Sequence, residues 1–176
     1  MSGSKLLDQL QAKFKDGITG SKLDAVDPWI EVAPTRLREV AKYVRDDANL
    51  KFDFLNCISV VDYFEPDAKK AAKVDWKAHL EVIYHLSSIS KKHQLVLKVI
   101  LPRWKDEVAG QLPEVQSVAD IWRTADWHER ECYDLGGVEF VGHPNLKRIL
   151  CPDDWEGYPL RKDYVMPLEY HGIRGR

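Results

Sequence analysis

Three strand-like runs between residues 52 and 101 constrain the fold of this chain more than any other feature. Residues 52–63 are rich in aromatic and β-branched side chains, and apolar residues alternate along residues 80–86 and again along residues 95–101. A period of two places apolar side chains on one face of a strand. The polar connection 87–93 is of hairpin length or slightly longer, so the last two runs are expected to pair. The runs predict a sheet meander with one buried face.

Helical spacing of apolar residues precedes this meander. Residues 4–16 carry leucines and a phenylalanine at helical spacing, and Gly17 suits a helix C-terminus. Residues 29–32 form a short strand candidate. Pro34 then opens a second helix, whose apolar residues over 37–44 follow the i, i+3, i+4, i+7 pattern. The N-terminal part therefore predicts helix, strand, helix.

A third helix is predicted after the meander. Ser117 and Asp120 stand at the spacing of a capping box, and apolar residues follow them. This helix is expected to run to about Leu135, where Gly136 and Gly137 stop it. Strands grouped in a meander with helices around them predict a two-layer α+β domain over residues 1–137, with a mixed or antiparallel sheet packed by helices.

Periodicity is lost from Val138 onward. Prolines punctuate a segment that is rich in Gly, Asp, Arg and Trp. A structureless segment this long is uncommon inside a compact domain, and this one is too aromatic and apolar for simple disorder. Its composition suits an extended strap, residues 138–176, whose Trp and Arg side chains dock on a partner. Packing of the strap on its own domain is the alternative, and composition does not decide between the two.

Composition excludes several classes of function. The formal net charge of −2 gives no clustered basic face for a nucleic acid. The apolar runs are far too short to span a bilayer, so no direct membrane span is expected. The N-terminus carries no apolar signal core, and the three cysteines are widely spaced, as free thiols in a reducing compartment would be. The cytoplasm is therefore the expected location, either free or on a membrane-attached assembly.

The densest polar cluster lies within the third predicted helix. Glu129 and Glu131 could be a pair of catalytic carboxylates, but residues two apart on a helix point in nearly opposite directions. Asp126, Arg130 and Asp134 share a face at i, i+4 spacing, which predicts an ion-pair ladder on the helix surface. The cluster thus favours structure over catalysis.

Metal and cofactor sites have little support in the sequence. His128 and Cys132 stand at i, i+4 spacing, but a closed zinc site needs about four ligands and no CxxC or HxxxH supplies the others. An iron–sulfur cluster normally takes four cysteines, and no glycine-rich phosphate loop is present. We expect no metal or cofactor in this chain. A free-standing metalloenzyme built on His128, Glu129 and Cys132 stays as the alternative from another class.

The stretch 127–164 resembles the signature of the 30 kDa subunit family of NADH:quinone oxidoreductases, the C subunits of respiratory complex I. The matching residues are Glu129-Arg130-Glu131, Asp134-Leu135, Gly137, Phe140, Gly142-His143-Pro144, Arg148-Ile149-Leu150, Asp153-Asp154-Trp155-Glu156-Gly157 and Pro159-Leu160-Arg161-Lys162-Asp163-Tyr164. Upstream, residues 58–62 resemble a family strand that ends in an aspartate. Two positions depart from the pattern: Gly136 stands where an aromatic residue is usual, and Tyr158 where histidine is frequent.

The resemblance implies a hydrophilic subunit of the peripheral arm of a proton-translocating complex, on the cytoplasmic face of the bacterial inner membrane. Such subunits carry no redox centre, and FMN and iron–sulfur clusters are expected in other subunits. The main partner would be the subunit that resembles a hydrogenase large subunit and helps to form the quinone cavity. An equivalent subunit of a membrane-bound hydrogenase, or of a ferredoxin-, F420H2- or plastoquinone-linked complex, is the runner-up.

The resemblance and the strap composition together predict which residues contact that partner. They are Glu129, Arg130, Glu131, Asp134, His143, Pro144, Arg148, Asp154, Trp155, Leu160, Arg161, Lys162, Asp163 and Tyr164. Arg161 in particular is expected to pair with a carboxylate or a backbone carbonyl of the neighbour, because a buried guanidinium needs acceptors for its donors.

Overall fold

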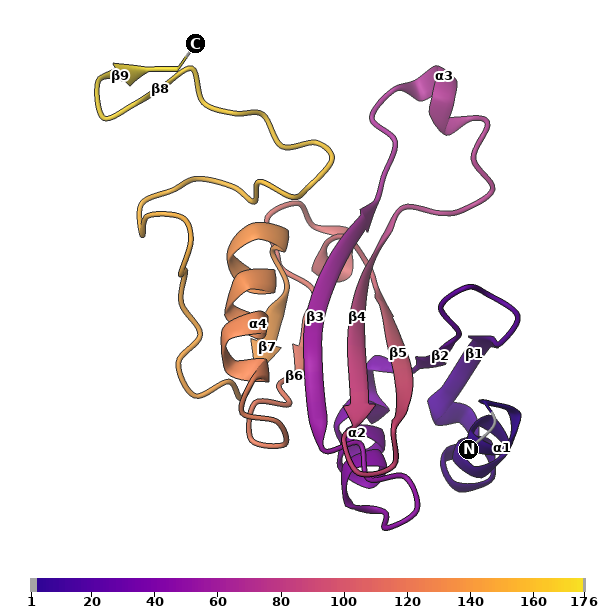
Figure 1. Cartoon of the computed structure of the whole chain (residues 1–176). Helices are drawn as coiled ribbons and strands as arrows, with labels where there is room; N and C mark the ends of the chain where they lie inside the picture. The colour runs from indigo at the N-terminus through magenta and orange to yellow at the C-terminus, as the bar shows by residue number, and fades with distance from the viewer. Residues whose placement is uncertain (1–2, 176) are drawn as a thin grey trace.

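The computed structural model of the chain describes residues 3–175, and a five-stranded sheet forms its centre (Figure 1). The strands are β1 (Ile18–Lys22), β2 (Trp29–Val32), β3 (Phe54–Tyr63), β4 (His79–Ser88) and β5 (His93–Leu101). Their order in the sheet is β1-β2-β5-β4-β3. β2 pairs parallel with β5, and the other neighbours pair antiparallel. The sheet is therefore mixed, which confirms the predicted α+β class.

The predicted meander is present as β3, β4 and β5. The hairpin of β4 and β5 pairs in regular register from Leu80 opposite Leu101 to Ser88 opposite His93. Strand β1 was not predicted from the sequence. Ile18 is its one buried residue, so it shows none of the apolar alternation by which a strand is recognised.

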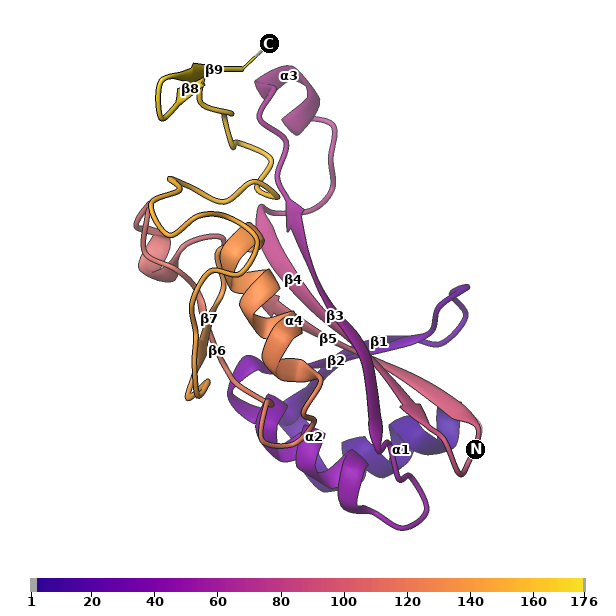
Figure 2. The same ribbon diagram turned by 60° about the vertical axis from the view of Figure 1, so that its left-hand side comes forward.

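Helices cover one face of the sheet. The α-helices are α1 (Gly3–Phe14), α2 (Leu37–Asp46), α3 (Ala68–Ala71) and α4 (Ala125–Glu131). Short 3-10 turns occupy Lys15–Gly17, Pro34–Arg36 and Lys105–Glu107. Figure 2 shows α1, α2 and α4 on the same side of the sheet, whereas α3 stands on an arm beyond the ends of β3 and β4. The core lies between these three helices and the inward apolar side chains of the strands.

The third predicted helix begins later than expected. Residues 117–124 form turns, and α4 starts at Ala125. Ser117 does not cap this helix. Its hydroxyl donates to Glu129 Oε2 at 2.5 Å, and the Val118 N–H donates to Glu129 Oε1 at 2.7 Å. The helix continues as a π turn, Cys132–Gly136, and ends at Gly137, whose φ of 68° is left-handed. Its end is thus where the sequence predicted it.

The core extends past residue 137, where the sequence predicts the domain to end. Strands β6 (Glu114–Gln116) and β7 (Glu139–Val141) form a parallel two-stranded sheet. Phe140 in β7 and Val138 just before it are buried. The sequence reasoning missed these two strands, because three-residue strands are too short to show a period in the sequence.

The strap begins after β7. From Gly142 it runs alongside α4 and turns back, and it ends in a small hairpin of β8 (Glu169–Tyr170) and β9 (Ile173–Arg174) (Figure 1). This hairpin lies at the opposite end of the molecule from α1 (Figure 1). The strap is thus an extended segment laid on its own domain.

Candidate functional site

Asp134 fastens the first part of the strap to the end of α4. Its side chain is fully buried, and its Oδ2 accepts the backbone N–H groups of Ile149, Leu150 and Cys151 at 3.0, 2.7 and 2.8 Å. Arg148 Nη1 donates to Oδ1 at 2.7 Å. Burial alone raises the pKa of Asp134, but these donors outweigh it and lower the pKa. An ionised carboxylate therefore fixes the turn at 148–151.

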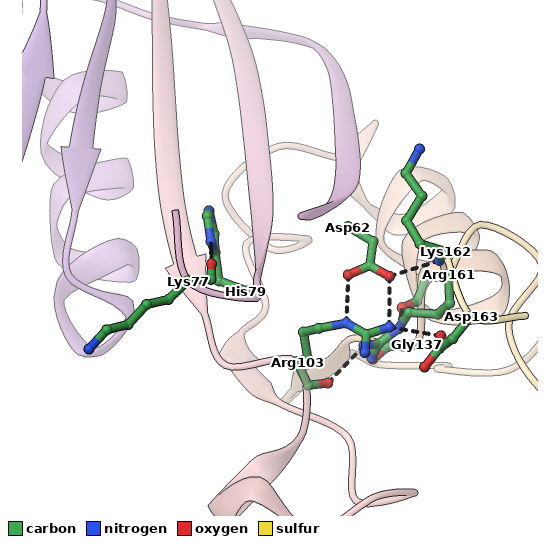
Figure 3. Close-up of polar contacts among 9 residues, drawn as sticks. Asp62, Lys77, His79, Arg103, Gly137, Arg161, Lys162 and Asp163 are labelled. Carbon is green, nitrogen blue, oxygen red and sulfur yellow. Dashed lines mark hydrogen bonds and ion pairs between the residues drawn. The ribbon is translucent and has the colours of Figure 1, made fainter. Parts of the chain in front are cut away.

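Asp62, at the end of β3, fastens the second part of the strap. Arg103 donates to both carboxylate oxygens of Asp62, at 2.7 and 2.8 Å, and to Asp163 Oδ1 at 2.7 Å (Figure 3). The Lys162 N–H donates to Asp62 Oδ2 at 2.8 Å. Burial lowers the pKa of Arg103, but its hydrogen bonds to the two carboxylates outweigh this effect and raise it. The bidentate geometry makes this pair rigid.

Arg161 completes this second attachment. Its guanidinium donates to the carbonyls of Gly136, Arg103 and Gly137 at 2.6, 2.8 and 3.0 Å. Figure 3 shows Arg161 beside Arg103 and Gly137. The guanidinium also stacks over the Trp104 ring at 4.3 Å. Carbonyls at a helix end lack intrahelical donors, so an inserted guanidinium satisfies them. Arg161 thus finds three carbonyl acceptors in its own chain.

A third group of contacts holds the end of the strap. Asp154 accepts a hydrogen bond from Tyr170 Oη at 2.8 Å, and His171 Nε2 lies 2.7 Å from its other oxygen. The Trp155 and Tyr170 rings lie 5.1 Å apart. These contacts join the turn at 154–155 to the terminal hairpin.

A buried polar cluster fixes α4 itself. Glu129 is completely buried, and its donors are Ser117 and Val118. His143 Nε2 lies 4.0 Å from Glu129 Oε2 and 3.1 Å from the backbone carbonyl of Asp126. Burial raises the pKa of Glu129 to about 7. The central carboxyl group of the cluster, that of Glu129, therefore lies inside the chain.

The predicted surface ladder on α4 is wrong. Arg130 and Asp134 are buried, and they contact the strap: Arg130 Nε lies 3.4 Å from the Lys147 carbonyl. The strap covers the face on which the ladder was expected. By contrast, Glu129 is buried and Glu131 is exposed, so the predicted divergence of these two carboxylates is confirmed.

The predicted contact residues therefore divide into two sets. The side chains turned into the chain are those of Glu129, Arg130, Asp134, His143, Arg148 and Arg161. Within the described residues, the contacts of these side chains are made inside the chain. Exposed residues are Glu131, Pro144, Asp154, Leu160, Lys162 and Asp163, and Trp155 and Tyr164 are half-buried. A partner could still meet the second set.

The structure adds four exposed apolar residues, which the sequence reasoning missed, to the predicted Leu160. Along the strap, the aliphatic side chains of Leu160, Val165, Met166, Leu168 and Ile173 are between 52% and 83% exposed. We name these five the outer strap residues. Their only signal in the sequence is the unusual number of large apolar residues in a proline-punctuated segment.

His128 and Cys132 do not form part of a ligand set here. Cys132 is buried, and its thiol points toward the Ile58 carbonyl at 3.7 Å. Burial raises the pKa of this thiol. Within residues 3–175, no three His, Cys, Asp or Glu side chains gather as metal ligands would. Over the same residues, no helix is long and apolar enough to cross a membrane.

Comparisons with solved structures support the fold. A trypsin-resistant fragment of Nqo5 superposes with a TM-score of 0.58 at 25% identity and covers 83% of this chain and 100% of the fragment. A chain of the membrane-bound sulfane sulfur reductase, described as an archaeal respiratory membrane complex, superposes with a TM-score of 0.69. The two chains are 23% identical, and the match covers 94% of this chain and 87% of the reductase chain. At this identity the likeness shows the fold alone.

Sequence comparisons identify the family. The C subunit of the NADH-quinone oxidoreductase of Chlorobium phaeobacteroides is 40% identical over 169 residues, which are 95% of this chain and 91% of that protein. The C subunit from Chloroherpeton thalassium is 39% identical over 94% of this chain, which spans only 62% of that longer protein. The family model described as "Respiratory-chain NADH dehydrogenase, 30 Kd subunit" matches residues 30–170. The chain therefore belongs to the 30 kDa subunit family of respiratory-chain NADH dehydrogenases.

Proposed function

We propose that this chain is a structural subunit of the peripheral arm of a proton-translocating NADH:quinone oxidoreductase. It holds the subunit that resembles a hydrogenase large subunit and forms part of the quinone site. It lies on the cytoplasmic face of the membrane as a peripheral component and is not catalytic alone. It carries no redox centre, and FMN and the iron–sulfur clusters belong to other subunits.

The observation that carries this proposal is the two-sided character of the strap. Its inner side is fixed by Asp62, Asp134 and Arg161, as described above. Its outer side presents the five outer strap residues to solvent. Large apolar side chains gathered within residues 160–173 mark an interaction surface, because water disfavours their exposure. The relatives from Chlorobium and Chloroherpeton are named as subunits of an oxidoreductase, and the other subunits of such an assembly supply a partner for this surface.

The attachments of the strap also favour binding energetically. A segment that folds only on binding loses conformational entropy at that moment, which weakens its affinity. Here the contacts with the domain order the strap beforehand. The outer strap residues are thereby held in place for the neighbouring subunit.

The proposal is tested by purifying the native assembly through this chain and identifying the subunits that accompany it. We expect a hydrogenase-large-subunit-like protein and an NADH-binding flavoprotein. Isolation without any hydrogenase-like partner would contradict the structural role. Isolation with that partner but without a flavoprotein would point to a complex with another electron donor.

A matched pair of variants tests the surface itself. Met166→Asp with Leu168→Asp places charges among the outer strap residues and should abolish co-purification of the neighbouring subunit. Val26→Asp is the control, because Val26 is 98% exposed on the loop between β1 and β2. If the wild type, the double variant and the Val26→Asp control all recover the neighbouring subunit equally, the outer strap residues are excluded as the interface.

Metal analysis tests the alternative of a metalloenzyme. The chain purified without a metal-affinity tag should contain no stoichiometric zinc or iron, since Cys132 is buried and points toward a carbonyl. A stoichiometric metal that is lost on Cys132→Ser would overturn the proposal.

A further inference from the structure

A cavity opens on the strap beside its second attachment. Its volume is about 360 Å³, at the lower end of the roughly 300–1,000 Å³ typical of ligand pockets. The aromatic rings of Trp104, Tyr158 and Tyr164 line it together with Val165. We name this cavity the aromatic pocket. Its lining is apolar over most of the residues, as in pockets that receive an apolar group.

Contacts within the chain hold the walls of the aromatic pocket in place. Trp104 stacks on the guanidinium of Arg161, which lies 4.3 Å from the centre of its ring. The Tyr158 ring faces the guanidinium of Arg148 at 5.3 Å. The N–H of Tyr164 donates to the Arg161 carbonyl at 3.1 Å. The pocket is therefore formed before a partner arrives, which lowers the entropic cost of binding.

Charged groups of both signs border the aromatic pocket and restrict what can enter it. Arg161 lines the pocket, and each of its three guanidinium nitrogens already donates to a carbonyl. Glu156 and Asp163 line it as well, and Asp163 accepts a hydrogen bond from Arg103. A cation in the pocket would meet the guanidinium of Arg161, and an anion would meet the two carboxylates. Like charges brought together weaken binding, so a neutral apolar group fits best.

We propose that the aromatic pocket receives one large apolar side chain, of the size of leucine, methionine or phenylalanine, from the hydrogenase-like neighbouring subunit. This inference rests on the proposed function and names the chemistry of the partner at one point of the interface. Val165 belongs both to the pocket and to the outer strap residues, and Met166 follows it directly. The pocket is thus continuous with the proposed interface. Interfaces concentrate their binding energy where such an anchor enters a pocket.

The test measures binding of the full chain to the neighbouring subunit at several salt concentrations. Tyr164→Ala removes one wall of the pocket and should weaken binding about tenfold at every salt concentration, because ions screen charges and not apolar contacts. Tyr164→Phe keeps the ring and should bind as the wild type does. Wild-type affinity in Tyr164→Ala would overturn the inference. A loss that disappears at high salt would show a charged occupant and would overturn it too.

Tyr43→Ala is the matched control, because Tyr43 is also half-buried and lies on α2, outside the pocket. It should bind as the wild type does, and equal weakening in this control would overturn the inference. If the Tyr164 variants bind normally while Met166→Asp with Leu168→Asp does not, the aromatic pocket is excluded and the proposed function stands. If the variant at Met166 and Leu168 also binds normally, the proposed function fails as well.

A photoreactive probe tests the occupant without removing a wall of the pocket. Val165 is 83% exposed, so an amino acid with a benzophenone side chain can replace it in the assembled complex. Irradiation should join this probe to an apolar residue of the hydrogenase-like subunit, which mass spectrometry identifies. A crosslink to a charged residue, a crosslink to a different subunit, or no crosslink in the assembled complex would overturn the inference.

Discussion

Glu129 is an acid whose environment sets its protonation state. Burial, with smaller contributions from Asp120 and Asp126, raises its pKa from 4.5 to about 7, against the hydrogen bonds from Ser117 and Val118. His143 lies 4.0 Å away. A carboxyl group whose pKa is raised on folding binds its proton more tightly in the native state. It therefore stabilises the fold less as pH rises through the interval from about 4.5 to 7.

We predict that Glu129→Gln removes this pH dependence. The wild type should lose about 3 kcal/mol of unfolding free energy between pH 4.5 and 7 through this group alone, since one pKa unit corresponds to about 1.4 kcal/mol. The glutamine can keep both hydrogen bonds and should flatten the profile measured by denaturant unfolding. Glu131→Gln, on the exposed side of α4, is the control and should leave the profile unchanged. An identical slope in wild type and Glu129→Gln would contradict the prediction.

Gly136 shows why one departure from the family pattern is tolerated. A Cβ atom at this position would overlap the side chain of Val60 on β3. Val60 therefore occupies the space in which a side chain at position 136 would begin. The sequence shows the unusual glycine, but it cannot show the compensating valine, because the contact joins residues 76 positions apart.

We predict that Gly136→Ala destabilises the fold by about 1–3 kcal/mol, the usual cost of overpacking a core. Combining it with Val60→Ala should restore much of the loss, because the smaller side chain makes room. Thermal melts of the two single variants and the double variant measure this coupling. Additive effects of the two substitutions would argue against the contact.

At the scale of elements, the sequence predicted those that bury a regular apolar face. The meander and the helices α1 and α2 appear close to their predicted positions, because each shows a clear period. The short strands β6 and β7 and the late start of α4 were missed. They depend on contacts between distant residues, such as the hydrogen bonds from Ser117 and Val118 to Glu129. The strap was recognised as an extended segment, but its inner attachments required the tertiary structure.

We predict that Asp62→Asn loosens the strap. The buried carboxylate joins Arg103 to the Lys162 N–H, and breaking such a buried pair typically costs about 3–5 kcal/mol. Trypsin should then cleave after Arg161 or Lys162 faster than in the wild type, as followed by mass spectrometry. Asp75→Asn on the α3 arm is the control and should leave the cleavage rate as it is. Protection equal to that of the wild type would show that Asp62 does not hold the strap.

At the scale of the whole molecule, the buried core lies at one end, and exposed apolar residues of the strap lie at the other. The sheet, the covering helices and the inner side of the strap form a continuous set of contacts that reaches Tyr164, whose N–H donates to the Arg161 carbonyl. Beyond Tyr164, Val165, Met166, Leu168 and Ile173 are exposed. Deletion of residues 138–176 would remove Val138 and Phe140 from the core and should unfold the chain. A truncation that tests docking to the partner must therefore begin closer to the C-terminus.

Deletion of residues 165–176 tests the central claim most directly. The truncated chain, measured by thermal unfolding and by co-purification with the neighbouring subunit, should keep its cooperative transition within a few degrees of the wild type, because it retains the attachments through Asp134, Asp62 and Arg161. Recovery of the hydrogenase-like subunit should be lost. A truncated chain that stays folded and still recovers that subunit at full yield would contradict the account, as would a truncated chain that unfolds.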